Sequence, residues 1–143
     1  MADTQTQFRP SVEKRRILVV EDEFINQEIL KMYLSDTYEV FLAGTGEEAL
    51  DILQNRYETI SLILLDLNLP DIHGLDVLRT VKDDSRYARI PVIVMTADSE
   101  AEVECLTLGA IDFIPKPYPS AEIVQTCVNR RIELSENSLN RPW

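Results

Sequence analysis

Short apolar runs recur along the chain, and segments with helical spacing separate them. Each run is rich in Val, Ile, Leu or Phe, as is typical of strands that are buried on both faces of a sheet. The runs cover residues 17–20, 40–42, 62–65, 92–95 and 113–114. Apolar residues at helical spacing predict helices within residues 25–34, 49–53, 75–81, 101–108 and 123–132. This alternation predicts parallel βαβ units in an open five-stranded α/β sandwich with helices on both faces.

Turn-forming residues fall between the predicted elements and support this division. Gly44 and Gly46 precede the second helix, Gly109 follows the fourth, and Pro91 opens the fourth strand. Both ends of the chain lack apolar periodicity. We therefore expect one domain over residues 16–135, with a flexible N-terminal extension over 1–15 and a flexible C-terminal tail over 136–143.

Length and charge narrow the classes of function. The chain has 143 residues, 45% of them apolar, which is enough for one domain with a substantial core. Its net charge of -11 repels phosphate backbones, and its densest basic cluster, residues 14–16, is short and follows Glu13. No apolar stretch is long enough to span a bilayer, and residues 1–10 are too polar for a signal peptide. We expect a cytoplasmic protein that binds neither nucleic acid nor membranes.

Cysteine and glycine usage exclude several kinds of site. Cys105 and Cys127 lack the spacing and the histidine partners of a zinc or redox site, so we expect reduced, partly buried thiols. With 4 glycines, the chain carries neither a dinucleotide fingerprint nor a P-loop. Any phosphate chemistry must therefore use side chains.

The polar residues that matter stand at the ends of the predicted strands. The carboxyl ends of parallel strands meet at one edge of a sheet, where ligands bind at the topological switch point. In a sheet of order 2-1-3-4-5, that point lies between the first and third strands, which would bring Glu21 and Asp22 beside Asp66. Thr96 ends the fourth strand and Lys116 follows the fifth. We therefore expect one pocket that contains all five residues.

Three carboxylates in one pocket repel one another unless a cation neutralises them. Oxygen ligands with open coordination positions suit Mg²⁺. On the other side of Asp66, Thr96 offers a hydroxyl donor and Lys116 a positive charge. This combination serves phosphoryl transfer, which depends on positioning and on neutralising the phosphoryl oxygens. Asp66 is the predicted nucleophile, and it would form an aspartyl phosphate.

At these residues the chain resembles the receiver domains of response regulators. Four segments carry the resemblance: residues 17–23 (ILVVEDE), 64–71 (LLDLNLPD), 90–97 (IPVIVMTA) and 109–118 (GAIDFIPKPY). The resemblance covers residues 17–134 and implies a flavodoxin-like, doubly wound parallel sheet of order 2-1-3-4-5 with five helices. It also implies a signalling module that takes its phosphoryl group from a sensor histidine kinase or a histidine phosphotransfer protein. Such a module is a phosphoacceptor with weak self-catalysed phosphorylation and dephosphorylation, rather than an enzyme.

The resemblance assigns roles to the residues of the site. Asp22 and Asp66 would bind Mg²⁺ by their side chains, Asn68 by its backbone carbonyl, and Glu21 directly or through water. Thr96 and Lys116 would hold the phosphoryl oxygens, and the bond from Lys116 to Pro117 matches one that is cis in receivers.

The resemblance also implies a conformational switch. Thr96 would move toward the phosphoryl group and Phe113 would swing inward behind it, altering the face formed by the fourth helix, the fifth strand and the fifth helix. That face is a candidate for homodimer formation. Phe113 lacks the hydroxyl of tyrosine, so switching cannot use a hydrogen bond from this ring, and Glu21 stands where many receivers carry Asp.

Two other functions are consistent with parts of the pattern. A phosphatase of the haloacid dehalogenase type also uses an aspartate nucleophile, a hydroxyl, a lysine and Mg²⁺, but its second aspartate falls where this chain has Asn68. A pseudo-receiver would bind partners without phosphorylation. His73, the only histidine of the sequence, and Asp71 are better explained as turn residues than as chemical groups.

Overall fold

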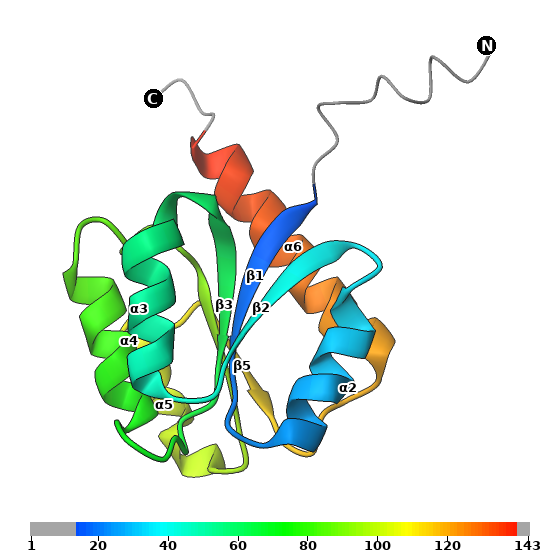
Figure 1. Ribbon diagram of the computed structural model, residues 1–143, viewed down its shortest axis with the longest axis horizontal. Coiled ribbons are helices and arrows are strands. Elements are labelled where there is room, and N and C mark those ends of the chain that lie inside the picture. The colour runs from blue at the N-terminus through cyan, green and yellow to red at the C-terminus, as the bar shows by residue number, and fades with distance from the viewer. Residues whose placement is uncertain (1–13, 140–143) are drawn as a thin grey trace.

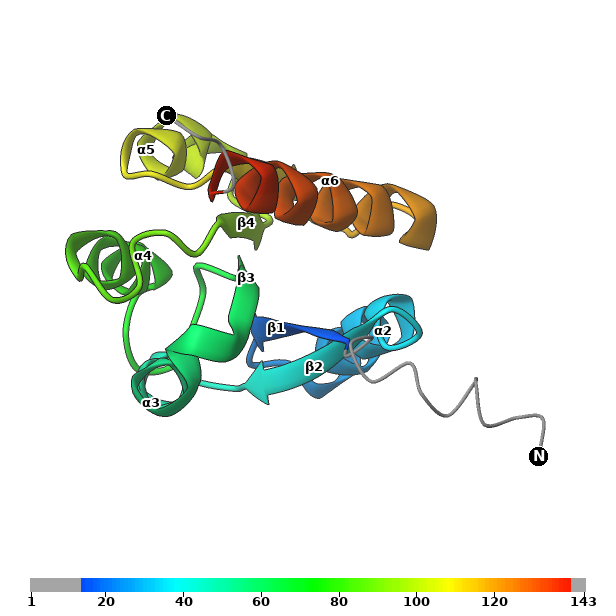
Figure 2. The ribbon, with the colours of Figure 1, turned by 90° about the horizontal axis from the view of Figure 1, so that it is seen from above.

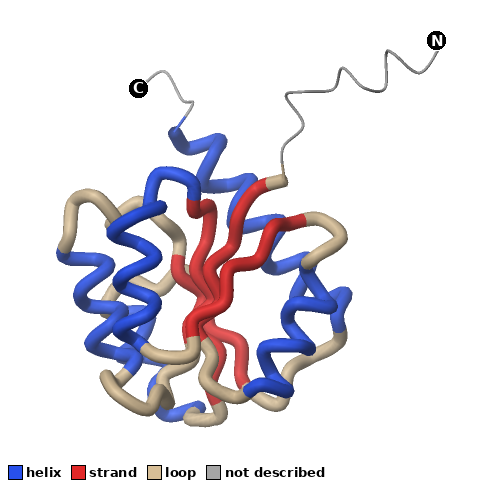
Figure 3. The backbone as a smooth tube through the Cα atoms, in the orientation of Figure 1, coloured by secondary structure: helices blue, strands red, loops and turns tan. Residues whose placement is uncertain are grey.

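The predicted strands pair in parallel to form one sheet (Figures 1 and 3). The computed structural model describes residues 14–139. Within them the strands are β1 (Arg15–Val20), β2 (Tyr38–Ala43), β3 (Ile60–Leu65), β4 (Val92–Thr96) and β5 (Asp112–Pro115). The sheet order is β2-β1-β3-β4-β5, so the chain leaves the neighbouring strands β1 and β3 toward opposite edges. The predicted flavodoxin-like fold is confirmed, with the topological switch point between β1 and β3.

Helices cover both faces of this sheet (Figure 2). They are α2 (Phe24–Leu34), α3 (Gly46–Arg56), α4 (Gly74–Asp83), α5 (Glu102–Thr107) and α6 (Ala121–Leu139), with short 3₁₀ turns at η1 (Tyr57–Thr59) and η2 (Ser99–Ala101). Helices α3, α4 and α5 pack on one face, and α2 and α6 pack on the other. None of the described helices is both long and apolar enough to cross a membrane.

The central strands are apolar throughout because they fill two cores at once. Successive side chains of a strand point to opposite faces of its sheet. In β1, Leu18 and Val20 pack under α3, α4 and α5, whereas Ile17 and Val19 pack under α2 and α6. This two-sided burial explains why the strands appear in the sequence as continuous apolar runs rather than as alternating patterns.

The two cysteines belong to different cores. Cys105 is buried on α5, and Cys127 is half-buried on α6. Because α5 and α6 cover opposite faces of the sheet, the two thiols lie on opposite sides of it. Both are free.

Helix α6 continues to Leu139, whereas we expected a flexible tail from residue 136 onward. The guanidinium of Arg15 in β1 pairs with the carboxylate of Glu136 (Nη2 to Oε1, 2.8 Å), and Ile132 is buried against the sheet. These contacts hold the late turns of α6 on the domain, although the sequence there lacks an apolar pattern. At the other end, β1 begins at Arg15, whereas we expected the flexible extension to run to residue 15. Residues 1–13 and 140–143 of the expected flexible ends lie outside the described residues.

The packing of α6 gives a direct prediction of stability. Ile132 has 3% of its surface exposed, whereas Leu134 on the same helix has 51% exposed. Ile132→Ala leaves a cavity and should lower the free energy of unfolding by about 2–5 kcal/mol. Leu134→Ala, the matched control, should change it by no more than about 0.5 kcal/mol. Urea unfolding monitored by circular dichroism measures both values, and equal losses would contradict this packing.

Candidate functional site

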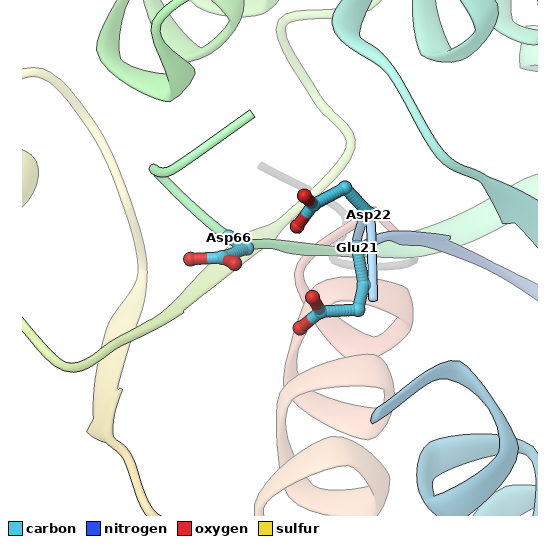
Figure 4. A group of neighbouring side chains, drawn as sticks. All are labelled: Glu21, Asp22 and Asp66. Carbon is cyan, nitrogen blue, oxygen red and sulfur yellow. The ribbon is translucent and has the colours of Figure 1, made fainter. Parts of the chain in front are cut away.

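Three carboxylates meet where β1 and β3 end (Figure 4). Glu21 and Asp22 directly follow β1, and Asp66 directly follows β3. The parallel register pairs Val20 with Leu65, and the backbone N–H of Asp66 donates to the carbonyl of Val20 at 3.0 Å. One carboxylate oxygen from each residue lies within 4.8 Å of those of the other two. The expectation that Glu21 and Asp22 lie beside Asp66 is met by this geometry.

Glu21 is fully buried, and three donors compensate its charge. Its Oε1 accepts hydrogen bonds from Lys116 Nζ at 2.8 Å and from the Tyr118 hydroxyl at 2.7 Å. Its Oε2 accepts one from the backbone N–H of Glu23 at 3.1 Å. Burial alone would raise the pKa of Glu21, but these bonds together hold the pKa below its ordinary value. Glu21 is therefore a buried, fully ionised group.

The negative charge of Asp66 has fewer and longer hydrogen bonds to compensate it than that of Glu21. Only 5% of its surface is exposed, and its Oδ2 accepts from Lys116 Nζ at 3.0 Å. Its Oδ1 accepts a longer bond, of 3.3 Å, from the backbone N–H of Asn68. Burial raises the pKa of Asp66, and the hydrogen bond and charge of Lys116 offset that rise only in part. Of the two buried carboxylates, Asp66 is thus the one that would gain more from an added positive charge.

Lys116 joins the two buried carboxylates. Its ammonium contacts Glu21 and Asp66, and 16% of its side chain is exposed. Burial would lower the pKa of Lys116, but hydrogen bonds to the two carboxylates raise it above its ordinary value. Lys116 therefore stays protonated and brings a fixed positive charge to Asp66.

Thr96 and Phe113 lie on β4 and β5, beside the strand ends that carry the carboxylates and Lys116. Thr96 is fully buried at the end of β4, and its hydroxyl accepts a hydrogen bond from the backbone N–H of Asp98 at 3.3 Å. Its carbonyl accepts from the backbone N–H of Lys116 at 2.9 Å, which ties β4 to the residue after β5. Among the described residues, the Thr96 hydroxyl makes no hydrogen bond to Asp66. Phe113 lies in β5, half-buried against the core under α3, α4 and α5.

The loop that follows Asp66 is fixed at several points. The carboxylate of Asp71 accepts from the backbone N–H groups of Gly46 at 2.8 Å and Glu47 at 2.9 Å, at the start of α3. The backbone N–H of Gly74 donates to the carbonyl of Leu67 at 2.8 Å. The loop therefore lies close to the sheet and is tied to a neighbouring helix.

His73 caps the start of α4, as an ordinary turn residue can. Its Nδ1 accepts from the backbone N–H of Leu75 at 3.1 Å, and the side chain is exposed. The side chain of His73 therefore serves as a helix cap and not as a group of the acidic pocket.

Two residues of the site received no role from the sequence. The Tyr118 hydroxyl donates to Glu21, and nothing in the sequence pattern around Lys116 indicated this contact. Gly74 lies against the backbone of the loop: a Cβ there would fall 2.4 Å from Leu67 Cα and 2.7 Å from the Asp66 carbonyl oxygen. Its sequence signal was a glycine at the end of the segment that follows Asp66, in a chain with 4 glycines.

Comparisons with known proteins agree with this geometry. The family model of the response regulator receiver domain matches residues 17–128. The cell cycle transcriptional regulator CtrA from Caulobacter vibrioides is 35% identical over 114 residues, which cover 76% of this chain and 47% of that protein. The chain thus spans about half the length of the curated relatives it matches.

Solved structures of receiver domains are similar to the chain over nearly their whole length. A CheY-like response regulator receiver domain protein from Methanospirillum hungatei has a TM-score of 0.80 and 26% identity, with 88% of this chain and 99% of that chain covered. The receiver domain of a sensor histidine kinase from Pseudomonas aeruginosa has a TM-score of 0.76 and 28% identity, with 85% and 99% covered. That domain was solved with a magnesium ion coordinated in its active site cleft.

Gly74 provides a test of the close approach between α4 and the acidic loop. Gly74→Ala forces backbone atoms apart and should lower the free energy of unfolding by roughly 1–3 kcal/mol. Gly44→Ala is the control, because its Cβ would meet only the ends of two side chains, Glu48 Oε1 at 3.3 Å and Gln27 Nε2 at 3.6 Å. Urea unfolding should give clearly different free energies of unfolding for the two variants. Equal values would show that the loop moves aside without loss of stability, which would contradict the close approach.

The raised pKa of Asp66 predicts how stability depends on pH without divalent cations. A carboxyl whose pKa is higher in the folded state binds its proton more tightly there, so its ionisation destabilises the fold as pH rises through the folded pKa. Asp66→Asn should therefore be more stable than the wild type at neutral pH. This advantage should shrink as pH falls toward the unfolded pKa of an aspartate. Thermal unfolding in EDTA across this range measures the difference, and an advantage that grows in acid would contradict the assignment.

Proposed function

Since the chain belongs to the response regulator receiver family, we propose that it is a phosphorylation switch of two-component signalling with Asp66 as the phosphoacceptor. One observation carries the proposal. The buried carboxylate of Asp66 lies between an acidic cluster and the ammonium of Lys116. A nucleophile flanked by a cation site and a fixed positive charge is what phosphoryl transfer requires.

The acidic cluster fits Mg²⁺ by the chemistry of its donors. Its ligands are hard oxygens, and burial leaves Asp66 short of positive charge. Asp22 and Asp66 would bind the ion by their side chains and Asn68 by its backbone carbonyl. Glu21, with three acceptor positions already occupied, would contribute directly or through water. When bound, the ion supplies positive charge that neutralises the phosphoryl oxygens.

The residues of the chain then carry out the transfer. A carboxylate oxygen of Asp66 attacks the phosphorus of a phosphohistidine, and an O–P bond forms as the P–N bond breaks. The electron pair of the broken bond stays on the imidazole nitrogen of the donor. Lys116 and Thr96 hold the phosphoryl oxygens by donating hydrogen bonds. The site has no separate general base in this scheme, in keeping with a phosphoacceptor whose self-catalysed phosphorylation and dephosphorylation are weak.

The signal is read on the face made by α5, β5 and α6. In the proposed switch the Thr96 hydroxyl leaves the Asp98 N–H for the phosphoryl group, and Phe113 moves inward behind it, which shifts a two-state equilibrium. This face exposes apolar side chains, including Val103 with 76% and Leu106 with 43% of their surface exposed. Such residues support a homodimer formed through this face.

The phosphoryl donor is a sensor histidine kinase or a histidine phosphotransfer protein. His73 is not needed as a donor, because it caps α4 outside the pocket. The net charge of -11 argues against nucleic-acid binding by this domain itself. The receiver domain would occupy residues 16–135, together with the late turns of α6.

The alternatives have less support. A haloacid dehalogenase-type phosphatase needs a second aspartate two residues after the nucleophile, where the chain has Asn68. A pseudo-receiver would not need Asp22, Asp66, Thr96 and Lys116 together. Negligible multiple turnover of p-nitrophenyl phosphate would separate a receiver from the phosphatase, and Mg²⁺ binding would separate it from the pseudo-receiver.

Loss of the phosphoacceptor tests the proposal directly. With Mg²⁺ and acetyl phosphate, intact mass spectrometry should show one phosphoryl group on the wild type and none on Asp66→Ala. Asp76→Asn is the matched control, because Asp76 is an exposed carboxylate of α4 paired with Arg79, and it should be modified like the wild type. Equal modification of Asp66→Ala and the wild type would overturn the assignment of Asp66.

A further inference from the structure

Tyr118 donates a hydrogen bond to the same oxygen of Glu21 that Lys116 contacts. The hydroxyl lies 2.7 Å and the ammonium 2.8 Å from Glu21 Oε1. The ring of Tyr118 packs against the core under α2 and α6, and Lys116 Nζ lies 5.4 Å from its centroid. Burial, with the hydrogen bond and charge of Glu21, raises the pKa of Tyr118, so the hydroxyl keeps its proton and remains a donor. Packing holds the ring, and the hydroxyl has one described partner, Glu21.

The buried carboxylate of Glu21 depends on its donors. None of its surface is exposed, so water cannot replace a lost hydrogen bond at little cost. Leaving a buried carboxylate partly unpaired is strongly unfavourable. Any change that draws one donor away from Glu21 therefore requires that another remain.

Lys116 is the donor that the proposed function draws away. Its ammonium now joins Glu21 and Asp66, at 2.8 and 3.0 Å. When Asp66 carries a phosphoryl group, Lys116 serves the phosphoryl oxygens, and its bond to Glu21 weakens. Tyr118 does not contact Asp66 and can stay on Glu21 throughout.

We propose that Tyr118 is a positioning residue for phosphorylation: its hydroxyl keeps Glu21 hydrogen bonded while Lys116 turns to the phosphoryl group on Asp66. This inference rests on the proposed function and adds a role that a phenylalanine at the same position could not perform. The hydroxyl thus contributes little to stability while Lys116 also donates to Glu21. It contributes most once the phosphoryl group is on Asp66 and Lys116 donates there instead.

Beryllofluoride binding in the presence of Mg²⁺ tests this role, because the complex mimics the phosphorylated aspartate. Isothermal titration calorimetry on Tyr118→Phe should show beryllofluoride affinity reduced about tenfold, the scale of one hydrogen bond to a charged group. The melting temperature without ligand should change little, because Lys116 still donates a hydrogen bond to the buried carboxylate of Glu21. Tyr33→Phe is the control: Tyr33 packs against the same core, and its hydroxyl makes no hydrogen bond to Glu21, Asp66 or Lys116. It should bind beryllofluoride like the wild type.

A double-mutant cycle with Glu21→Gln shows whether the hydroxyl acts through Glu21. Removing the charge of Glu21 removes the need for compensation, so Tyr118→Phe should have a smaller effect in that background. Wild-type affinity in Tyr118→Phe, or an equal loss in both backgrounds, would overturn the role of Tyr118. A wild type that does not bind beryllofluoride would overturn the proposed function itself, and this inference with it.

Discussion

The ammonium of Lys116 contacts two buried carboxylates, those of Glu21 and Asp66. The charge balance of the pocket depends on this shared contact. Without this charge, Glu21 and Asp66 would face each other with little water to screen them, at a cost of several kcal/mol for each unpaired ion. Glu21 has two further donors, whereas Asp66 has one long backbone contact. The unequal division leaves Asp66 as the carboxylate that attracts positive charge. A symmetric arrangement would not single out one carboxylate.

The sheet provides the rigidity that this balance needs. Glu21 and Asp66 follow neighbouring strands whose residues are held in register and buried on both faces. Small displacements of either carboxylate would require the two cores to repack, and close-packed interiors resist that. The lysine comes from a strand end at the far side of β4, and the backbone bond from Lys116 to Thr96 fixes its starting point. The sheet therefore holds the two buried carboxylates, whereas the ammonium lies at the end of a long side chain with several rotatable bonds.

The elements and the acidic residues could be predicted because both follow from local rules. Buried parallel strands are continuous apolar runs, and their carboxyl ends converge, so Glu21, Asp22 and Asp66 could be placed together before any coordinates. The contacts that could not be predicted join segments whose relative path only the folded chain defines. Tyr118 depends on the course of the chain after β5, Asp71 caps a helix 25 residues earlier, and Arg15 meets Glu136 across 121 residues. Each of these contacts is polar and leaves no periodic pattern in the sequence.

The loop from Asp66 to Gly74 differs from most surface connections in one respect. Loops usually tolerate insertions and deletions because their ends are fixed and their middle is free. Here the middle is also fixed, since Asp71 is bonded to the first turn of α3 and Gly74 lies against Leu67. Side chains along the loop can vary, but an added or removed residue would pull Asp71 from α3 or Gly74 from the strand end. The geometry therefore sets the number of residues between Asp66 and Gly74, whatever those residues are.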